Sequence, residues 1–210
     1  MEEASRNWYA LKIFYNRVFD MERLLAETGI SSYIAANKVE LEGSKYLSAR
    51  RRLALMEEKG QTDTRFVREG LTLYRRVPMV SSLMFFHAPQ EQIKQVEGFL
   101  YDPEGFLPPK GFIYKTPDWH SYAVIPPRQM EIFRLVTESG DTGLEFFSDD
   151  ATTHYKKGDK VRVTDGPLKG AEGYIKRIRK DRRLLVCIEG IIAVATSYIP
   201  PENLEIIKEE

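Results

Sequence analysis

The chain has 210 residues, of which 42% are hydrophobic and 11% aromatic, and this composition excludes an intrinsically disordered protein. The length suits either one large domain or two modest ones. The 31 Lys and Arg residues balance 31 Asp and Glu residues, so the whole molecule is not a general binder of polyanions. The single cysteine, Cys187, excludes an internal disulfide and fits a reducing cytosol.

Export and membrane signals are also missing from the sequence. The opening residues 1–7 are acidic and polar and lack the apolar stretch of a signal peptide. Every apolar run is shorter than the roughly 20 residues that cross a bilayer. We therefore expect a cytoplasmic protein that does not contact a membrane.

The first half of the chain alternates predicted strands and helices. Residues 7–15 are aromatic-rich and alternate, which predicts a strand. One face of this strand carries Tyr9, Leu11 and Ile13, and the other carries Trp8, Ala10, Lys12 and Phe14. The further predicted elements are a helix over 18–25 that Gly29 ends, a strand over 78–87, a helix over 89–100, a short strand over 112–114 and a helix that begins at Pro126-Pro127.

The stretch 44–60 interrupts this pattern. It is charged, favours a helix and contains the basic run Arg50-Arg51-Arg52. A charged helix of this kind is more often a solvated face than a nucleic-acid contact, but the run is a candidate site for DNA or RNA.

From Glu138 onwards the sequence changes character. Polar, turn-forming residues around Leu144–Phe147 predict an inter-domain linker over 139–155. Short β-branched runs follow, split by turns, at 160–163, 173–178, 184–188 and 191–195. Several short strands within about fifty residues favour a small β-barrel, because closure removes exposed sheet edges. The expected fold class is α+β: an N-terminal αβ domain over 1–138 and a C-terminal β-barrel domain over 156–210.

The inventory of reactive side chains argues against an enzyme. His87, His120 and His154 are scattered and have no metal-ligand spacing. Cys187 lies among Leu185, Val186 and Ile188, which predicts an inert thiol within a strand. The sequence also lacks a glycine-rich loop for phosphate. We expect no catalytic residue, no metal and no cofactor.

The most specific motif runs from Lys157 to Leu204 and resembles the KOW domain, a small SH3-like barrel, of NusG-type transcription factors. The matching features are Gly158, Val161, Val163, the turn Asp165-Gly166-Pro167-Leu168, Gly173 and the strand pair around Gly190. The turn needs the unusual backbone angles that Gly166 supplies, and a side chain at Gly173 would crowd a sharp bend of the barrel. Where this family usually has an aromatic residue at the loop tip, this chain has Leu168.

The first half resembles the N-terminal (NGN) domain of the same family, an αβ sandwich. The opening Asn7-Trp8-Tyr9-Ala10-Leu11 matches the first family strand, and residues 125–133 look like the last family helix. Ser82 and Leu83 stand where the family has Gly and Tyr. The resemblance implies that the domain binds the clamp helices of the largest RNA polymerase subunit. The residues implied in this contact are Lys12, Phe14, Leu83, Phe85 and Tyr114.

The resemblance further implies a second partner, a termination factor or a small-subunit ribosomal protein, for the C-terminal domain. The residues implied there are Gly166, Pro167, Leu168 and Lys169. The departures at 83 and 168 and the insertion at 44–60 favour a specialised paralogue. The chain looks most like the UpxY antiterminators of Bacteroides, which act on capsular polysaccharide operons, and family precedent implies a monomer.

Three alternatives stay open on the sequence. The chain can be the general housekeeping elongation factor, or a ribosome- or RNA-binding module, since KOW barrels also occur in ribosomal proteins. A third alternative is that the barrel docks on the N-terminal domain and masks its polymerase-binding patch. The β-branched residues of the second half favour strands over the helices into which some specialised paralogues refold this domain.

Overall fold

The computed structural model describes residues 5–101, 110–148, 159–178 and 181–207. The chain divides into two compact units, Met1–Ile113 and Tyr114–Glu210. Each unit has its own sheets and core and is described by itself. In the described ranges, we find no helix long and apolar enough to span a membrane.

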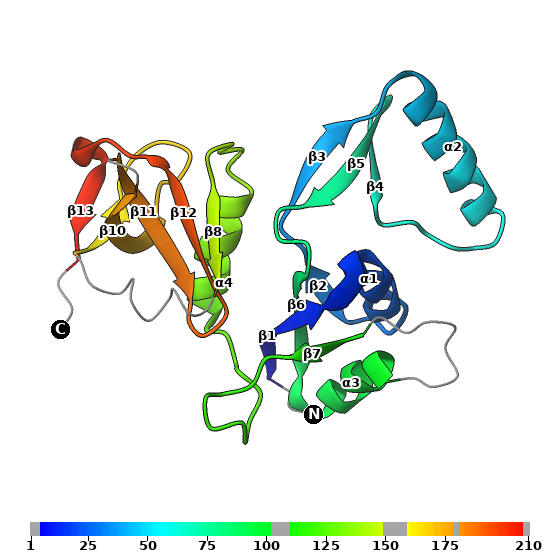
Figure 1. Cartoon of the computed structure of the whole chain (residues 1–210), viewed down its shortest axis with the longest axis horizontal. Helices are drawn as coiled ribbons and strands as arrows, with labels where there is room; N and C mark the ends of the chain where they lie inside the picture. The colour runs from blue at the N-terminus through cyan, green and yellow to red at the C-terminus, as the bar shows by residue number, and fades with distance from the viewer. Residues whose placement is uncertain (1–4, 102–109, 149–158, 179–180, 208–210) are drawn as a thin grey trace. The chain divides into compact units, whose positions relative to one another are not determined.

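The main sheet of the first unit is antiparallel, in the order β2-β6-β1-β7 (Figure 1). Its strands are β1 (Arg6–Ile13), β2 (Ser31–Tyr33), β6 (Leu83–Pro89) and β7 (Gly111–Ile113). The accompanying helices are η1 (Phe14–Asn16), α1 (Val18–Glu27), η2 (Gln90–Gln92) and α3 (Ile93–Tyr101). Tyr9, Leu11 and Ile13 are buried, as their alternation along β1 predicts. Helix α1 contacts α3 and β2, and α3 contacts β7, so both helices bury their apolar stripes in this unit.

A smaller layer of the same unit consists of a helix on a three-stranded sheet of order β3-β5-β4 (Figure 1). Its elements are β3 (Ala36–Glu40), α2 (Gly43–Glu57), β4 (Phe66–Glu69) and β5 (Thr72–Pro78). The helix confirms the prediction for residues 44–60, whereas the three strands were not predicted. Tyr46, Ala49 and Leu53 of α2 lie at helical spacing and pack with Leu73 and Phe66 of the strands.

One arginine connects this layer to the rest of the unit. Arg76 of β5 donates hydrogen bonds of 2.8 and 3.1 Å to the carboxylate of Glu22 on α1, and its guanidinium lies 5.0 Å from the ring centre of Phe19. Both charged side chains are largely buried, with 19% and 12% of their surface exposed. The bidentate geometry therefore fixes how the small sheet sits on α1.

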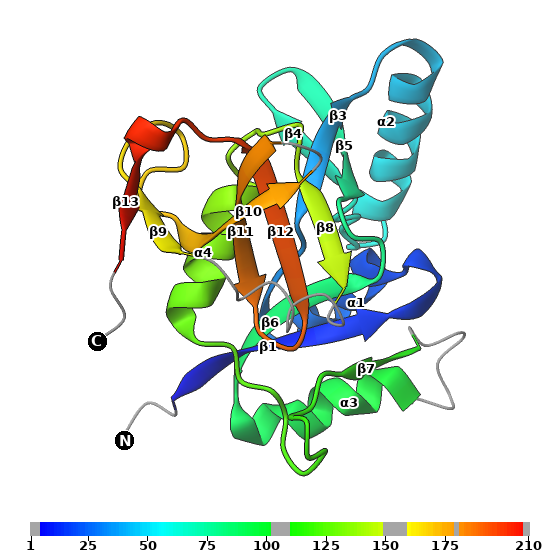
Figure 2. The same ribbon diagram turned by 60° about the vertical axis from the view of Figure 1, so that its left-hand side comes forward.

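The second unit is built on a six-stranded antiparallel sheet of order β13-β9-β10-β11-β12-β8 (Figure 2). Its elements are α4 (Pro127–Thr137), β8 (Glu145–Ser148), β9 (Lys160–Val163), β10 (Glu172–Ile178), β11 (Asp181–Ile188), β12 (Ile192–Tyr198), η3 (Pro201–Asn203) and β13 (Leu204–Ile206). The four β-branched runs of the sequence thus form β9 to β12, as predicted. Among the described residues β8 and β13 are the edges of this sheet, so a closed barrel stays a prediction.

The observed division differs from the predicted boundaries. Helix α4, expected in the domain 1–138, lies in the second unit, where it contacts β11. Strand β8, expected within the linker 139–155, pairs with β12. The reason is burial: α4 has an apolar face that includes Phe133, and Phe147 of β8 packs against the cluster around Leu185. Residues 149–155 of the predicted linker and 156–158 of the predicted barrel lie outside the described residues.

Candidate functional site

The residues implied in polymerase binding lie mostly on one face of the main sheet, opposite the face that carries Tyr9, Leu11 and Ile13. Ala10 is paired directly with Phe85, and Lys12 is paired with Leu83 on one side and with Phe112 on the other. Because paired residues point to the same face, these side chains form one surface, as the alternation predicts. However, Leu83 and Phe85 are only 6% and 1% exposed. Both side chains are therefore largely buried.

Phe85 is buried partly because β6 is a central strand. Ala10 on β1 and Tyr33 on β2 flank it directly, and the rings of Tyr33 and Phe85 lie 6.5 Å apart. An aromatic residue with strand neighbours on both sides loses much of its surface within the sheet itself. The role of Phe85 in polymerase binding stays a prediction.

Exposed aromatic residues gather instead at the end of β1. Phe14 and Phe112 are 39% and 37% exposed, and their rings meet edge to face with 6.2 Å between centroids. Tyr15 follows and is 81% exposed. We call Phe14, Tyr15 and Phe112 the aromatic edge. Tyr114, which was predicted beside them, follows the end of β7 and falls in the second unit.

Phe112 belongs to the aromatic edge but was not among the predicted residues, although the sequence holds a signal for it. Phe112 alternates with Tyr114, so a strand that presents one residue on a face presents the other on the same face. Gly111 holds this strand close to β1, because a Cβ atom at that position would collide with the carbonyl oxygen of Lys12. The close approach brings the Phe112 ring against Phe14.

The aromatic edge also contains unusual backbone. Tyr15 and Asn16 are consecutive non-glycine residues with φ angles of 59° and 55°, in the left-handed region. Such conformations cost free energy and cluster at functional sites. The strained turn projects Tyr15 outwards at the point where β1 ends.

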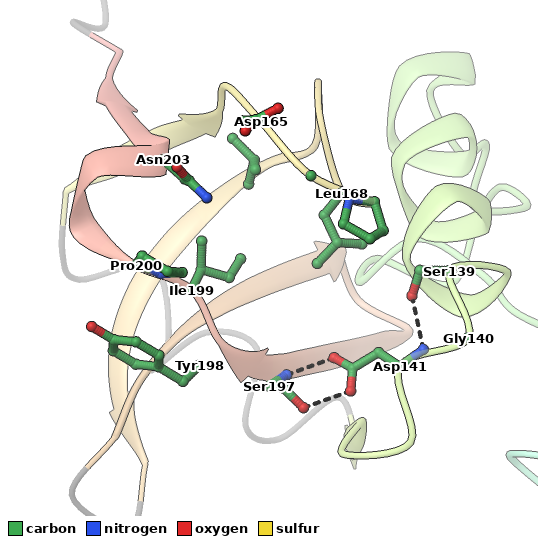
Figure 3. A pocket seen from close by; sticks show the side chains of 13 residues that line it. Ser139, Gly140, Asp141, Asp165, Leu168, Ser197, Tyr198, Ile199, Pro200 and Asn203 are labelled. Carbon is green, nitrogen blue, oxygen red and sulfur yellow. Dashed lines mark hydrogen bonds between the residues drawn. The ribbon is translucent and has the colours of Figure 1, made fainter.

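In the second unit, a pocket lies beside the predicted partner loop (Figure 3). Its volume is about 360 Å³, and it is lined by Val163, Asn203 and the segments 139–141, 165–168 and 197–200. We call it the C-terminal pocket. Gly166 has a φ angle of 82°, which confirms the backbone conformation predicted for this turn.

Three of the four predicted loop residues line this pocket. Gly166, Pro167 and Leu168 line it, whereas Lys169 is exposed and does not. Leu168 is only 9% exposed, so it is part of the pocket wall and not a side chain at a loop tip. An aliphatic residue suits this buried position, which explains physically why an aromatic ring is not needed here.

Asp141 fixes the rim of the C-terminal pocket (Figure 3). Its carboxylate accepts hydrogen bonds from the backbone amide of Ser197 at 2.7 Å, the Ser197 hydroxyl at 2.5 Å and the amide of Gly143 at 2.8 Å. Burial alone would raise the pKa of Asp141, but these hydrogen bonds outweigh it and hold the pKa below its ordinary value. The segment after α4 is thereby tied to the end of β12.

The three arginines of the basic run on α2 differ in their partners. Arg50 and Arg51 are exposed, but Arg52 donates to Asp63 at 3.0 Å. Asp63 also accepts bonds of 2.7 and 2.8 Å from the guanidinium of Arg65 and is 5% exposed. Burial raises the pKa of Asp63, yet the bonds from Arg65 and the charges of Arg65 and Arg52 leave it below its ordinary value. Arg52 therefore stabilises the loop after α2.

The described residues contain no group of three His, Cys, Asp or Glu side chains that could hold a metal ion. Cys187 lies on β11 as predicted, paired with Ala193, and is half-buried. His154 lies outside the described residues. The ring of His87 stacks on the ring of Trp8, with 4.9 Å between their centroids.

Comparison with known proteins gives a structural similarity. No family model matches the chain, and no curated protein matches it. The chain is similar to a solved structure from work on domain interaction in Thermotoga maritima NusG, with a TM-score of 0.41 and 14% identity. The alignment covers 97% of this chain and 98% of that chain.

Proposed function

We propose that the protein is a NusG-type transcription elongation factor that binds RNA polymerase through the aromatic edge. The supporting observation is the cluster of Phe14, Tyr15 and Phe112, exposed at a strained turn beside Lys12. Exposed aromatic residues are the side chains that most often anchor protein interfaces. The likeness of Asn7–Leu11 to the first NGN strand points to the clamp helices of the largest subunit as the partner.

The C-terminal pocket is the proposed site of a second partner. Leu168, Ile199 and Pro167 give it an apolar wall, so it suits an apolar side chain of another protein. The KOW resemblance suggests a small-subunit ribosomal protein or a termination factor. In this proposal the protein acts mechanically, because one unit holds the polymerase while the other recruits the second partner.

The specialised role rests on the sequence departures. By the resemblance, Leu83 and Leu168 stand where the family has aromatic residues, and the stretch 44–60, most of which forms α2, is an insertion. We propose antitermination at particular operons, as in the UpxY group that acts on capsular polysaccharide operons. Deletion of the gene should then silence distal parts of a few operons, whereas a lethal deletion would favour the housekeeping alternative.

The proposal is tested by pull-down of purified RNA polymerase with the full chain. Phe14→Asp/Phe112→Asp should weaken binding by at least about thirtyfold, because one aromatic anchor is worth about 2 kcal/mol. Trp119→Asp is the matched control, since Trp119 is 74% exposed and lies in the other unit. Equal binding by all three proteins would refute the aromatic edge as the contact. Binding to ribosomal RNA without polymerase would favour the ribosome-centred alternative.

A further inference from the structure

The C-terminal pocket is shaped by hydrogen bonds between its walls. The amide of Gly170 donates to the carbonyl oxygen of Val163 at 2.8 Å, which fixes the turn that follows β9. The amide of Thr164 donates to the carbonyl oxygen of Asn203 at 2.9 Å, which joins the same turn to η3. Asp141 ties the third wall to β12, as described above. A hollow fixed in this way loses little conformational entropy when a ligand enters it.

The floor of this pocket is apolar, and its size suits a side chain. Val163, Leu168 and Ile199 line it and are only 1%, 9% and 7% exposed. Figure 3 shows Leu168 and Ile199 on opposite sides of the hollow. The volume of about 360 Å³ is near the lower end of the range for ligand pockets, which is roughly 300–1,000 Å³. The pocket therefore has room for one large apolar side chain and part of its backbone.

The charge of the lining has one sign. Among the described residues that line the pocket, the charged side chains are Asp141 and Asp165, and no Lys or Arg accompanies them. Asp141 already accepts three hydrogen bonds. The carboxylate of Asp165 is exposed and has no hydrogen bond or ion pair in the described parts of the chain. A free carboxylate beside an apolar hollow attracts a cation and repels phosphates and acidic side chains.

Two further side chains at the pocket suit a peptide. The side-chain amide of Asn203 lies beside the hollow in Figure 3 and has no hydrogen bond within the described ranges. An amide both donates and accepts, so it matches a peptide backbone, which presents the same two groups. The ring of Tyr198 borders the pocket and is 55% exposed, and an aromatic face attracts Lys and Arg side chains.

We propose that the C-terminal pocket binds a basic peptide segment of a partner protein. One large apolar side chain of the segment fills the hollow between Leu168 and Ile199. A neighbouring Lys or Arg of the segment pairs with Asp165, and the amide of Asn203 bonds to its backbone. This inference rests on the second-partner role proposed above for the same pocket, and it states the chemistry that the partner presents. An acidic segment would instead bring its carboxylates against Asp165 without a compensating cation in the described lining.

Selection of a displayed library of random nine-residue peptides on the immobilised full chain tests this proposal. Enriched peptides should combine a Leu, Ile, Phe or Trp with a Lys or Arg within two positions. Replacing the apolar residue of the best peptide with Ala should weaken binding, measured by fluorescence anisotropy, at least about tenfold. Replacing its basic residue with Gln should weaken binding about threefold, and less at high salt, because salt screens an exposed ion pair.

Charge reversal at the pocket separates this contact from a general effect on folding. Asp165→Lys should weaken binding of the basic peptide about tenfold and should strengthen binding of the same peptide with Glu at the basic position. Asp159→Lys is the matched control, since Asp159 is exposed in the same unit and does not line the pocket. Asn203→Ala should weaken both peptides by the same factor, about threefold, because it removes a contact to the peptide backbone.

The outcomes separate this inference from the role on which it rests. If no peptide is enriched, both the peptide chemistry and the second-partner role of the pocket are overturned. If acidic or uncharged peptides are enriched and Asn203→Ala weakens them, the partner role stands and the basic segment is overturned. The ion pair is also overturned if Asp165→Lys binds the basic peptide as tightly as wild type, or if Asp159→Lys weakens it equally.

Discussion

Asp141→Ala tests whether the segment after α4 belongs to the C-terminal unit. The carboxylate accepts three hydrogen bonds, two from Ser197 on β12 and one from Gly143. A hydrogen bond to a charged group contributes about 1.5–3 kcal/mol when buried. Asp141 is half-buried, so water compensates part of each loss and we expect a total cost of about 2 kcal/mol. For a unit of about a hundred residues this lowers the Tm by about 8–16 °C.

The pH dependence of this loss has a definite sign. The folded pKa of Asp141 lies below its ordinary value of 3.8, so its ionised form stabilises the folded state. This stabilisation is fully present above the ordinary pKa and is lost as the pH falls through the lower folded pKa. The difference in unfolding free energy between wild type and Asp141→Ala should therefore be largest at pH 7 and shrink below pH 3.8.

Urea unfolding at pH 7 and pH 2.5, with amide hydrogen exchange of β8, measures both effects. Exchange in β8 should accelerate in the variant, because Asp141 holds the segment that leads into this strand. Asp165→Ala is the control, since Asp165 lines the same pocket without a side-chain hydrogen bond in the described ranges. The reasoning fails if Asp141→Ala costs the same at both pH values, or if β8 exchanges at the wild-type rate.

Three further substitutions test individual contacts. Gly173→Ala should lower the free energy of unfolding by about 2 kcal/mol, because the added Cβ collides with the carbonyl oxygen of Leu185. An unchanged midpoint of urea unfolding would contradict the close approach of Gly173 to Leu185. Asp63→Ala should lower the free energy of unfolding by about 2 kcal/mol at pH 7, because it leaves Arg65 unpaired. The loss should be smaller in acid, since the pKa of Asp63 is lowered and its stabilising charge is lost there. A loss that is the same at every pH would show that charge is not the cause. Leu168→Asn should lower thermal stability by about 2–3 kcal/mol as a buried side chain, whereas an exposed loop tip would tolerate it.

Much of the local structure follows from the sequence. The β-branched runs predict β9 to β12 because alternation within a strand is a local property. The same holds for α2 and for the buried face of β1 with Tyr9, Leu11 and Ile13. The turn at Gly166 and the crowding at Gly173 were also predictable, since each depends on what glycine alone permits.

The tertiary structure decided which sheet each apolar face joins. Periodicity gives α4 an apolar stripe, but the stripe itself does not say that Phe133 is buried in the second unit. The polar residues around β8 resemble a linker until Phe147 meets the cluster around Leu185. These contacts join residues far apart in the chain, and their free energy comes from surface that both partners bury together.

The candidate site residues also divide into those that the sequence predicted and those that only the fold identified. The sequence alone identified Phe14 and the loop at Gly166 as candidates. Only the fold showed that Phe85 is buried and Phe112 exposed, because exposure depends on which strands flank each residue. It also showed that Arg52, predicted as part of a basic run, donates to Asp63. A sequence determines the charge of each residue, whereas pairing and burial, which decide whether that charge is free, come from three-dimensional packing.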